Sequence, residues 1–106
     1  MPSSASDKAT YSTVAVGNIG HGTSWAGFAH TGSASTTDYA LVQNASGKTY
    51  VNCATGQHLQ LRQNNSPIMT LDDSKVGIGT TDPSKHLHIY EPSTNAVYLQ
   101  LSNSTS

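Results

Sequence analysis

His58–Gln63 reads HLQLRQ, and apolar and polar side chains alternate along it as far as Arg62. Successive side chains of a β-strand point to opposite faces of the sheet. The pattern therefore predicts a strand that buries Leu59 and Leu61 on one face and exposes polar groups on the other. The same alternation returns in residues 97–102, which read VYLQLS.

Short segments rich in Thr, Val and Tyr recur at roughly ten-residue spacing, and Gly, Pro, Asn or Asp separates one from the next. No stretch shows a sustained helical period, so the sequence predicts an all-β fold. The predicted strands are Tyr11–Val16, Ser24–His30, Tyr39–Asn44, Thr49–Ala54, His58–Gln63, Ile68–Asp72, Val76–Ile78, His86–Tyr90 and Val97–Ser102.

The composition is polar without being charged. Ser, Thr, Asn and Gln make up 40 of the 106 residues, whereas Lys, Arg, Asp and Glu number 11. Leu, Val, Ile and Phe number 18, a small supply for a core, yet the net charge of −1 gives none of the self-repulsion of a disordered chain. We therefore expect an assembly in which several copies share one core.

The charge pattern and the apolar runs exclude several classes of partner. Five basic residues are scattered along the chain, and the pI near 6.5 offers no electrostatic footprint for nucleic acid. No apolar run is long enough to enter a membrane. Cys53 is the single cysteine, so it forms no intrachain disulfide and is expected to be an inert thiol.

Residues 68–89 read IMTLDDSKVGIGTTDPSKHLHI. This segment resembles one found in tail-fibre and tailspike-like proteins of phages and large viruses, with the pattern V-G-I-G-T-x-x-P followed by K-L-H-V. Residues 76–83 carry the match. Here the last part is His86-Leu87-His88-Ile89, a departure from the family pattern. In such proteins the segment precedes an intramolecular chaperone that trimerises the shaft and is then cut off.

The resemblance implies a homotrimeric β-fibre or tailspike-like module of short strands, of β-prism or triple-stranded β-helix type. Gly77 and Gly79 alternate with apolar residues, which suits a place where three backbones approach an axis. We expect a flexible lead-in at 1–10, a shaft or head module at 11–66, a trimeric neck at 67–92, and a terminal strand and tail at 93–106. The expected trimer core is Leu59, Leu61, Leu71, Val76, Ile78, Leu87 and Ile89.

His86 and His88 lie two residues apart, so in a strand they project to one face. Three chains would then bring six imidazoles around the axis and form a cage for a transition-metal ion. One alternative is that Leu87 and Ile89 point to the core while both histidines face water, and another is that His88 is buried and hydrogen-bonded. Alternation alone does not decide among the three, and no other cofactor is expected.

Trp25, Tyr39 and His30 lie among Ser, Thr, Asn and Gly, a setting that suits shallow sugar-binding surfaces. We expect them to contact a host-surface glycan; the alternative is that at least one of the aromatic rings packs in the core. Asp72 and Asp73 are the acids that a glycosidase would need as a pair, but they either point to opposite faces of a strand or lie together in a turn, where carboxylates are ordinarily solvated. The sequence therefore indicates a protein that is not an enzyme.

The predicted function is a structural and adhesive part of a viral tail fibre or tailspike on the outer face of the virion. Its partners are two further copies of itself and a host cell-surface glycan, with no nucleic acid and no membrane insertion. The alternative is a self-contained carbohydrate-binding β-sandwich domain that is not part of a fibre.

Overall fold

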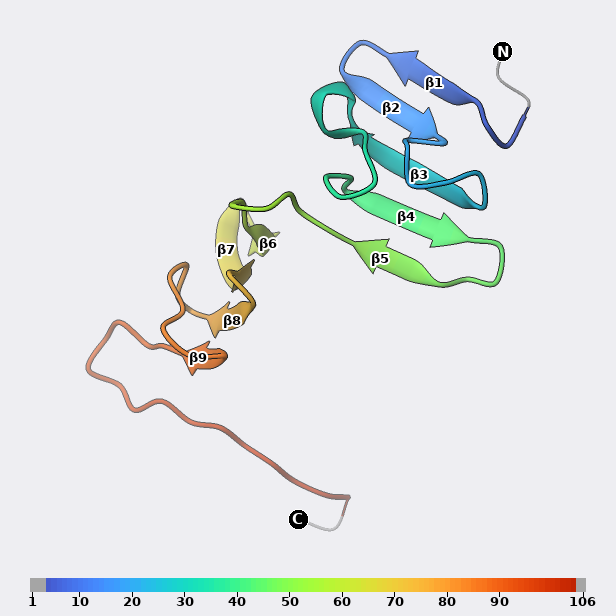
Figure 1. Ribbon diagram of the computed structural model, residues 1–106. Coiled ribbons are helices and arrows are strands. Elements are labelled where there is room, and N and C mark those ends of the chain that lie inside the picture. Colours follow the sequence, from blue (N-terminus) through green and yellow to red (C-terminus); the bar gives the residue numbers. More distant parts are fainter. Residues whose placement is uncertain (1–3, 105–106) are drawn as a thin grey trace. The chain divides into compact units, whose positions relative to one another are not determined.

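The computed structural model describes residues 4–104 of the chain, and these residues form β-strands and one 3-10 turn (Figure 1). The chain divides into two compact units at the bond between Gln57 and His58. Each unit holds one sheet. The prediction of an all-β fold is confirmed.

The first unit is an antiparallel sheet in which each strand pairs with the next along the chain. A 3-10 turn, η1 (Thr31–Ser33), follows the third strand. The strands are β1 (Lys8–Tyr11), β2 (Val14–Gly17), β3 (Trp25–His30), β4 (Leu41–Asn44) and β5 (Thr49–Val51).

The second unit is a sheet with the order β6-β7-β8-β9, in which only the last pair is parallel. Two-residue turns join the three antiparallel strands. Asn64 and Asn65 in one turn, and Asp73 and Ser74 in the other, all have positive φ, as a type I′ turn requires. The strands are β6 (Leu59–Gln63), β7 (Ser66–Asp72), β8 (Lys75–Ile78) and β9 (Leu87–Ile89).

The first sheet buries a small core on one face only. Ala15, Ala29 and Val42 of the sheet are fully buried beneath Ile19 and Tyr39, which come from the loops before β3 and β4. Gly27 lies beside Val42 in the register, and a Cβ at this position would collide with the Ile19 side chain. The glycine thus leaves the space into which the loop inserts Ile19.

In the second sheet, too, a loop packs over a glycine. Gly77 of β8 is buried, and a Cβ there would lie 2.6 Å from the carbonyl oxygen of Thr80 and 3.4 Å from Cβ of Pro83. The loop after β8 therefore covers this face of its own sheet. The expectation that Gly77 brings three chains together at an axis is wrong, because the backbone that it admits belongs to the same chain.

Several expected boundaries also differ from the structure. The division between 66 and 67 falls inside β7, and the lead-in at 1–10 overlaps β1, although residues 1–3 lie outside the described part. The predicted strand Tyr11–Val16 is two strands separated by a turn at Ser12, whose φ is 56°. The predicted strand Val97–Ser102 is not a strand.

The insertion of Ile19 over Gly27 gives a test of the first unit. The Gly27→Ala substitution is expected to lower the free energy of unfolding by about 1–3 kcal/mol, because the added methyl group overpacks the core. In an Ile19→Ala background the same substitution should cost much less, since the colliding side chain is gone. Urea unfolding of the unmodified protein, the two single variants and the double variant measures how strongly the two positions are coupled. An equal loss of unfolding free energy on Gly27→Ala in both backgrounds would contradict this packing.

Candidate functional site

The second sheet has one apolar face, and the register shows how it is built. Two rows of paired residues cross the strands: Leu59, Leu71, Val76 and Leu87 form one, and Leu61, Met69, Ile78 and Ile89 form the other. Positions two apart in a strand share a face, so both rows lie on the same side. We call these eight residues the apolar face.

The apolar face is not covered by its own chain. Leu61 and Leu87 are 57% and 56% exposed, Leu71 is 40% exposed, and none of the eight is buried. The sheet's buried residues, Thr70 and Gly77, lie on the opposite side, beneath the loop after β8. All seven residues expected in a trimer core belong to this face.

Met69 is the member of the apolar face that the sequence analysis missed. It lies two residues before Leu71 in β7 and pairs with both Leu61 and Ile78. The period-two spacing from Leu71 was the available signal. A bulge between Pro67 and Met69 leaves Ile68 without a partner in the register, so the alternation is interrupted just before Met69.

The first sheet repeats this one-sided arrangement. The face opposite its core carries a row of apolar residues, one from each of four neighbouring strands, and all of them are exposed. The row consists of Val16, Phe28, Leu41 and Val51. A hollow of about 270 Å³ lies beside Phe28 and Leu41 on this face.

Trp25 belongs to an aromatic cluster on the core side of the first sheet. The ring of His21 meets the rings of Trp25 and Tyr39 edge to face, with centroids 4.9 and 4.8 Å apart. The centroid of the Tyr50 ring lies 5.0 Å from that of the Trp25 ring. The His21 ring is also held by its Nδ1 atom, which lies 3.1 Å from the carbonyl oxygen of Thr36. Trp25 is therefore supported from behind by neighbouring rings.

A hollow of about 430 Å³ opens beside Trp25. We call it the Trp25 hollow. Besides Trp25, its lining includes residues with hydroxyl, amide and carboxylate groups, which are the groups that hydrogen-bond to sugar hydroxyls, while an aromatic ring can stack on a sugar ring. These residues are Ser4, Asp7, Asn18, Thr23, Ser24, Gln43 and Asn44, and Ala5, Gly17, Ala26 and Ala45 complete the lining.

The structure separates the three residues expected to contact a glycan. Trp25 lines the hollow, whereas Tyr39 is only 6% exposed and supports His21 from inside the core. His30 lies on the opposite face of β3 from Trp25, because the two residues are five positions apart in one strand, an odd number. Its Nδ1 accepts a hydrogen bond from the N–H of Gly32 at 2.9 Å. His30 therefore belongs to a turn and not to the Trp25 hollow.

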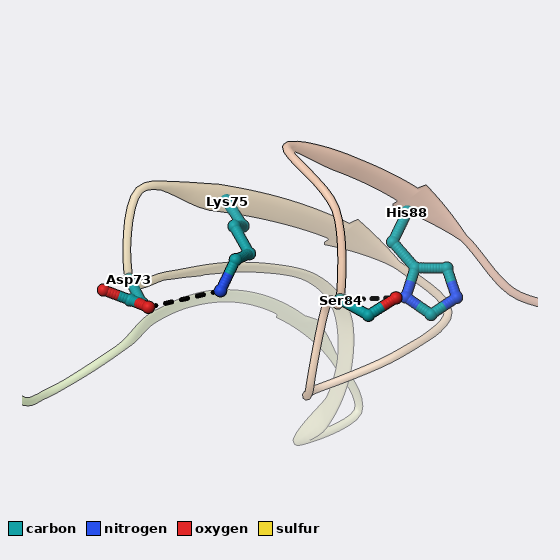
Figure 2. A network of polar contacts seen from close by, with 4 residues as sticks. All are labelled: Asp73, Lys75, Ser84 and His88. Carbon is teal, nitrogen blue, oxygen red and sulfur yellow. Dashed lines mark hydrogen bonds and ion pairs between the residues drawn. The ribbon is translucent and has the colours of Figure 1, made fainter.

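The histidine pair lies away from the apolar face. Leu87 and Ile89 are on that face, so His88 between them points to the opposite side of β9. There its Nδ1 accepts a hydrogen bond from the N–H of Ser84 at 3.2 Å, as Figure 2 shows. An axis lined by Leu87 and Ile89 cannot also be lined by His88, so the expected core and the expected cage exclude each other.

Residues 4–104 contain no group of three or more His, Cys, Asp or Glu side chains that could hold a metal ion. Asp73 lies in the turn between β7 and β8, is 86% exposed and pairs with Lys75 at 3.2 Å (Figure 2). An ion pair this open to water contributes little to stability. The N–H and side chain of Ser93 lower the pKa of the fully exposed Glu91 by hydrogen bonding to its carboxylate.

No protein-family profile, curated protein or solved structure matches the chain. Within the described residues no helix has the length and apolar character that crossing a membrane requires.

The orientation of β9 leads to a prediction about metal content. Protein purified without a histidine tag is expected to hold iron, nickel and zinc well below the one ion per three chains of a six-histidine cage. Elemental analysis measures this ratio directly. A stoichiometric ion that is lost in the His88→Ala variant would instead place His88 at the trimer axis. The apolar face could then not line that axis.

Proposed function

We propose that this chain is a structural and adhesive module of a trimeric viral tail fibre or tailspike, exposed on the virion. Three copies bury their apolar faces against one another, and each copy presents its Trp25 hollow to a host-surface glycan. The exposed apolar face of the second sheet is the observation that carries the proposal.

The apolar face supports self-assembly for a physical reason. Contiguous apolar surface of this kind marks an interaction site in soluble proteins. Full burial of a Leu, Ile, Val or Met side chain is worth about 1.5–3 kcal/mol, and of the eight side chains here three are exposed and five are only half-buried. None of the eight is charged, and the net charge of one chain is only −1, so copies meet without strong repulsion.

The number of copies and the viral setting come from the resemblance of residues 68–89 to tail-fibre segments. A closed ring of three copies would pair the apolar face of each with those of the other two, leaving no open surface for further growth. The loop side of the sheet, with Gly77 and His88, would then face outward in every copy.

The adhesive role draws on the Trp25 hollow. Single contacts between a shallow polar surface and a sugar are weak, but three copies on one rigid assembly bind a repetitive glycan surface with much greater avidity. Support from His21 and Tyr50 keeps the Trp25 ring in place before any ligand arrives. Such preorganisation lowers the entropic cost of binding.

The apolar face predicts the oligomeric state. The unmodified protein is expected at about 33 kDa by light scattering, three times the 11.1 kDa of one chain. The Leu61→Asp variant should fall to a folded monomer, because the new carboxylate would be buried without a partner. Leu61 is more than half exposed in the single chain, so the substitution leaves the sheet itself intact.

The matched control is Arg62→Asp, which places the same carboxylate one residue further along β6, on the other face. This variant should keep the trimeric mass. A folded 11 kDa species for the unmodified protein would contradict the trimer and favour a self-contained carbohydrate-binding domain. Equal effects of the two variants would contradict the role assigned to the apolar face.

We predict that the glycan binds in the Trp25 hollow. On a printed glycan array, the Trp25→Ala variant should lose at least tenfold in binding, and Thr23→Arg, which fills the hollow without touching the core, should do the same. Tyr11→Ala is the control, because Tyr11 is an exposed aromatic residue outside the hollow. Loss with Tyr11→Ala, or retention with Thr23→Arg, would move the site elsewhere.

A further inference from the structure

The segment Val97–Leu101, which reads VYLQL, has the pattern of a strand but no sheet to belong to. Its three apolar residues alternate with Tyr98 and Gln100. In the structure the segment is extended without strand pairing (Figure 1), and Val97, Leu99 and Leu101 are 50%, 67% and 86% exposed. We call it the C-terminal segment.

The C-terminal segment also lacks the features that keep exposed strands from pairing with other chains. Natural edge strands are protected by charges, prolines or bulges. No charged residue occurs between residues 92 and 104, and no proline lies within the segment. No hydrogen bond joins its backbone to another described residue. Its N–H and C=O groups are therefore free to pair.

The free edge of β6 offers a matching partner. β6 is an outer strand of the second sheet, and its five residues equal the length of the C-terminal segment. Its sequence, LQLRQ, places Leu59 and Leu61 on the apolar face. Its one charged side chain, Arg62, is held by Gln60 and by the carbonyl oxygen of Asn65 at 2.9 Å each, along its own hairpin.

We propose that the C-terminal segment of one copy adds as a strand to the free edge of β6 in a neighbouring copy. Main-chain hydrogen bonds would supply the affinity, and alternate side chains would supply the specificity. In this arrangement Val97, Leu99 and Leu101 extend the apolar face beyond β6. Tyr98 and Gln100 lie on the polar side. This inference rests on the proposed assembly of identical copies and names the segment that joins them.

A neighbouring copy is favoured because the segment does not pair with β6 of its own chain in the structure. β9 and β6 are the two outer strands, so to reach that edge the segment would have to cross about four strand spacings, roughly 19 Å at about 4.8 Å each. Residues 90–96 span at most about 23 Å when fully extended, only a little more than this distance. Two local hydrogen bonds, from Ser93 N–H to Glu91 and from Asn95 N–H to Ser93, bend the link, so it is not fully extended.

Cross-linking between two differently labelled chains tests the pairing. Both chains carry Cys53→Ser; one has Arg62→Cys in β6, and the other has Gln100→Cys in the C-terminal segment. After they are refolded together and oxidised, we expect a disulfide between the two chains. The control replaces Arg62→Cys with Lys48→Cys, which lies in an exposed turn of the first sheet, and should give at least tenfold less product.

A second measurement separates this inference from the proposed function. The V97S/L99S/L101S variant should lose the trimeric mass or weaken it at least tenfold, whereas the Y98S/Q100S variant should retain it. If the unmodified protein is trimeric but the first variant is equally trimeric and no 62–100 disulfide forms, the strand addition is overturned and the trimer stands. If the unmodified protein is a monomer, both proposals fail.

Discussion

A β-sheet has two faces, and in each unit of this protein the chain covers only one of them. The loop containing Ile19 closes one side of the first sheet over Gly27, and the loop containing Thr80 and Pro83 closes one side of the second over Gly77. The chain has too few residues to cover both faces of each sheet, so one face of each stays exposed. The uncovered faces collect the large apolar residues, and the assembly that we propose is the means by which they leave water.

The two glycines show how small the protein's own cores are. At both positions a missing side chain lets a loop lie directly on the sheet, so a few residues fill the space that a second layer would otherwise occupy. A core that needs only a few residues suits a chain with few apolar residues. The two units also carry different surfaces, since the first unit bears the Trp25 hollow and the uncovered side of the second sheet bears the apolar face.

Alternation in the sequence predicted most of the strands and seven of the eight residues later found together on the apolar face, because period two maps directly onto the sides of a sheet. Alternation gave a wrong prediction where strand pairing, and not the order of apolar and polar residues, decides whether a strand forms. Residues 97–101 alternate as well as β6 does, yet they form no strand, because a strand needs a pairing partner and in the single chain this segment pairs with no sheet edge. The position of Tyr39 depends on the loop before β4, which composition does not encode, whereas the odd spacing of Trp25 and His30 within one predicted strand was enough to place them on opposite faces.

The most direct test is hydroxyl-radical footprinting of Leu61 and Leu87 in the native protein, read out by mass spectrometry and normalised to the unfolded chain. In a single chain these side chains are 57% and 56% exposed, so each would label at about half the unfolded rate. Our account predicts labelling close to that of a buried side chain. Labelling near half the unfolded rate in the native protein would show that the apolar face stays in water, and would contradict the account.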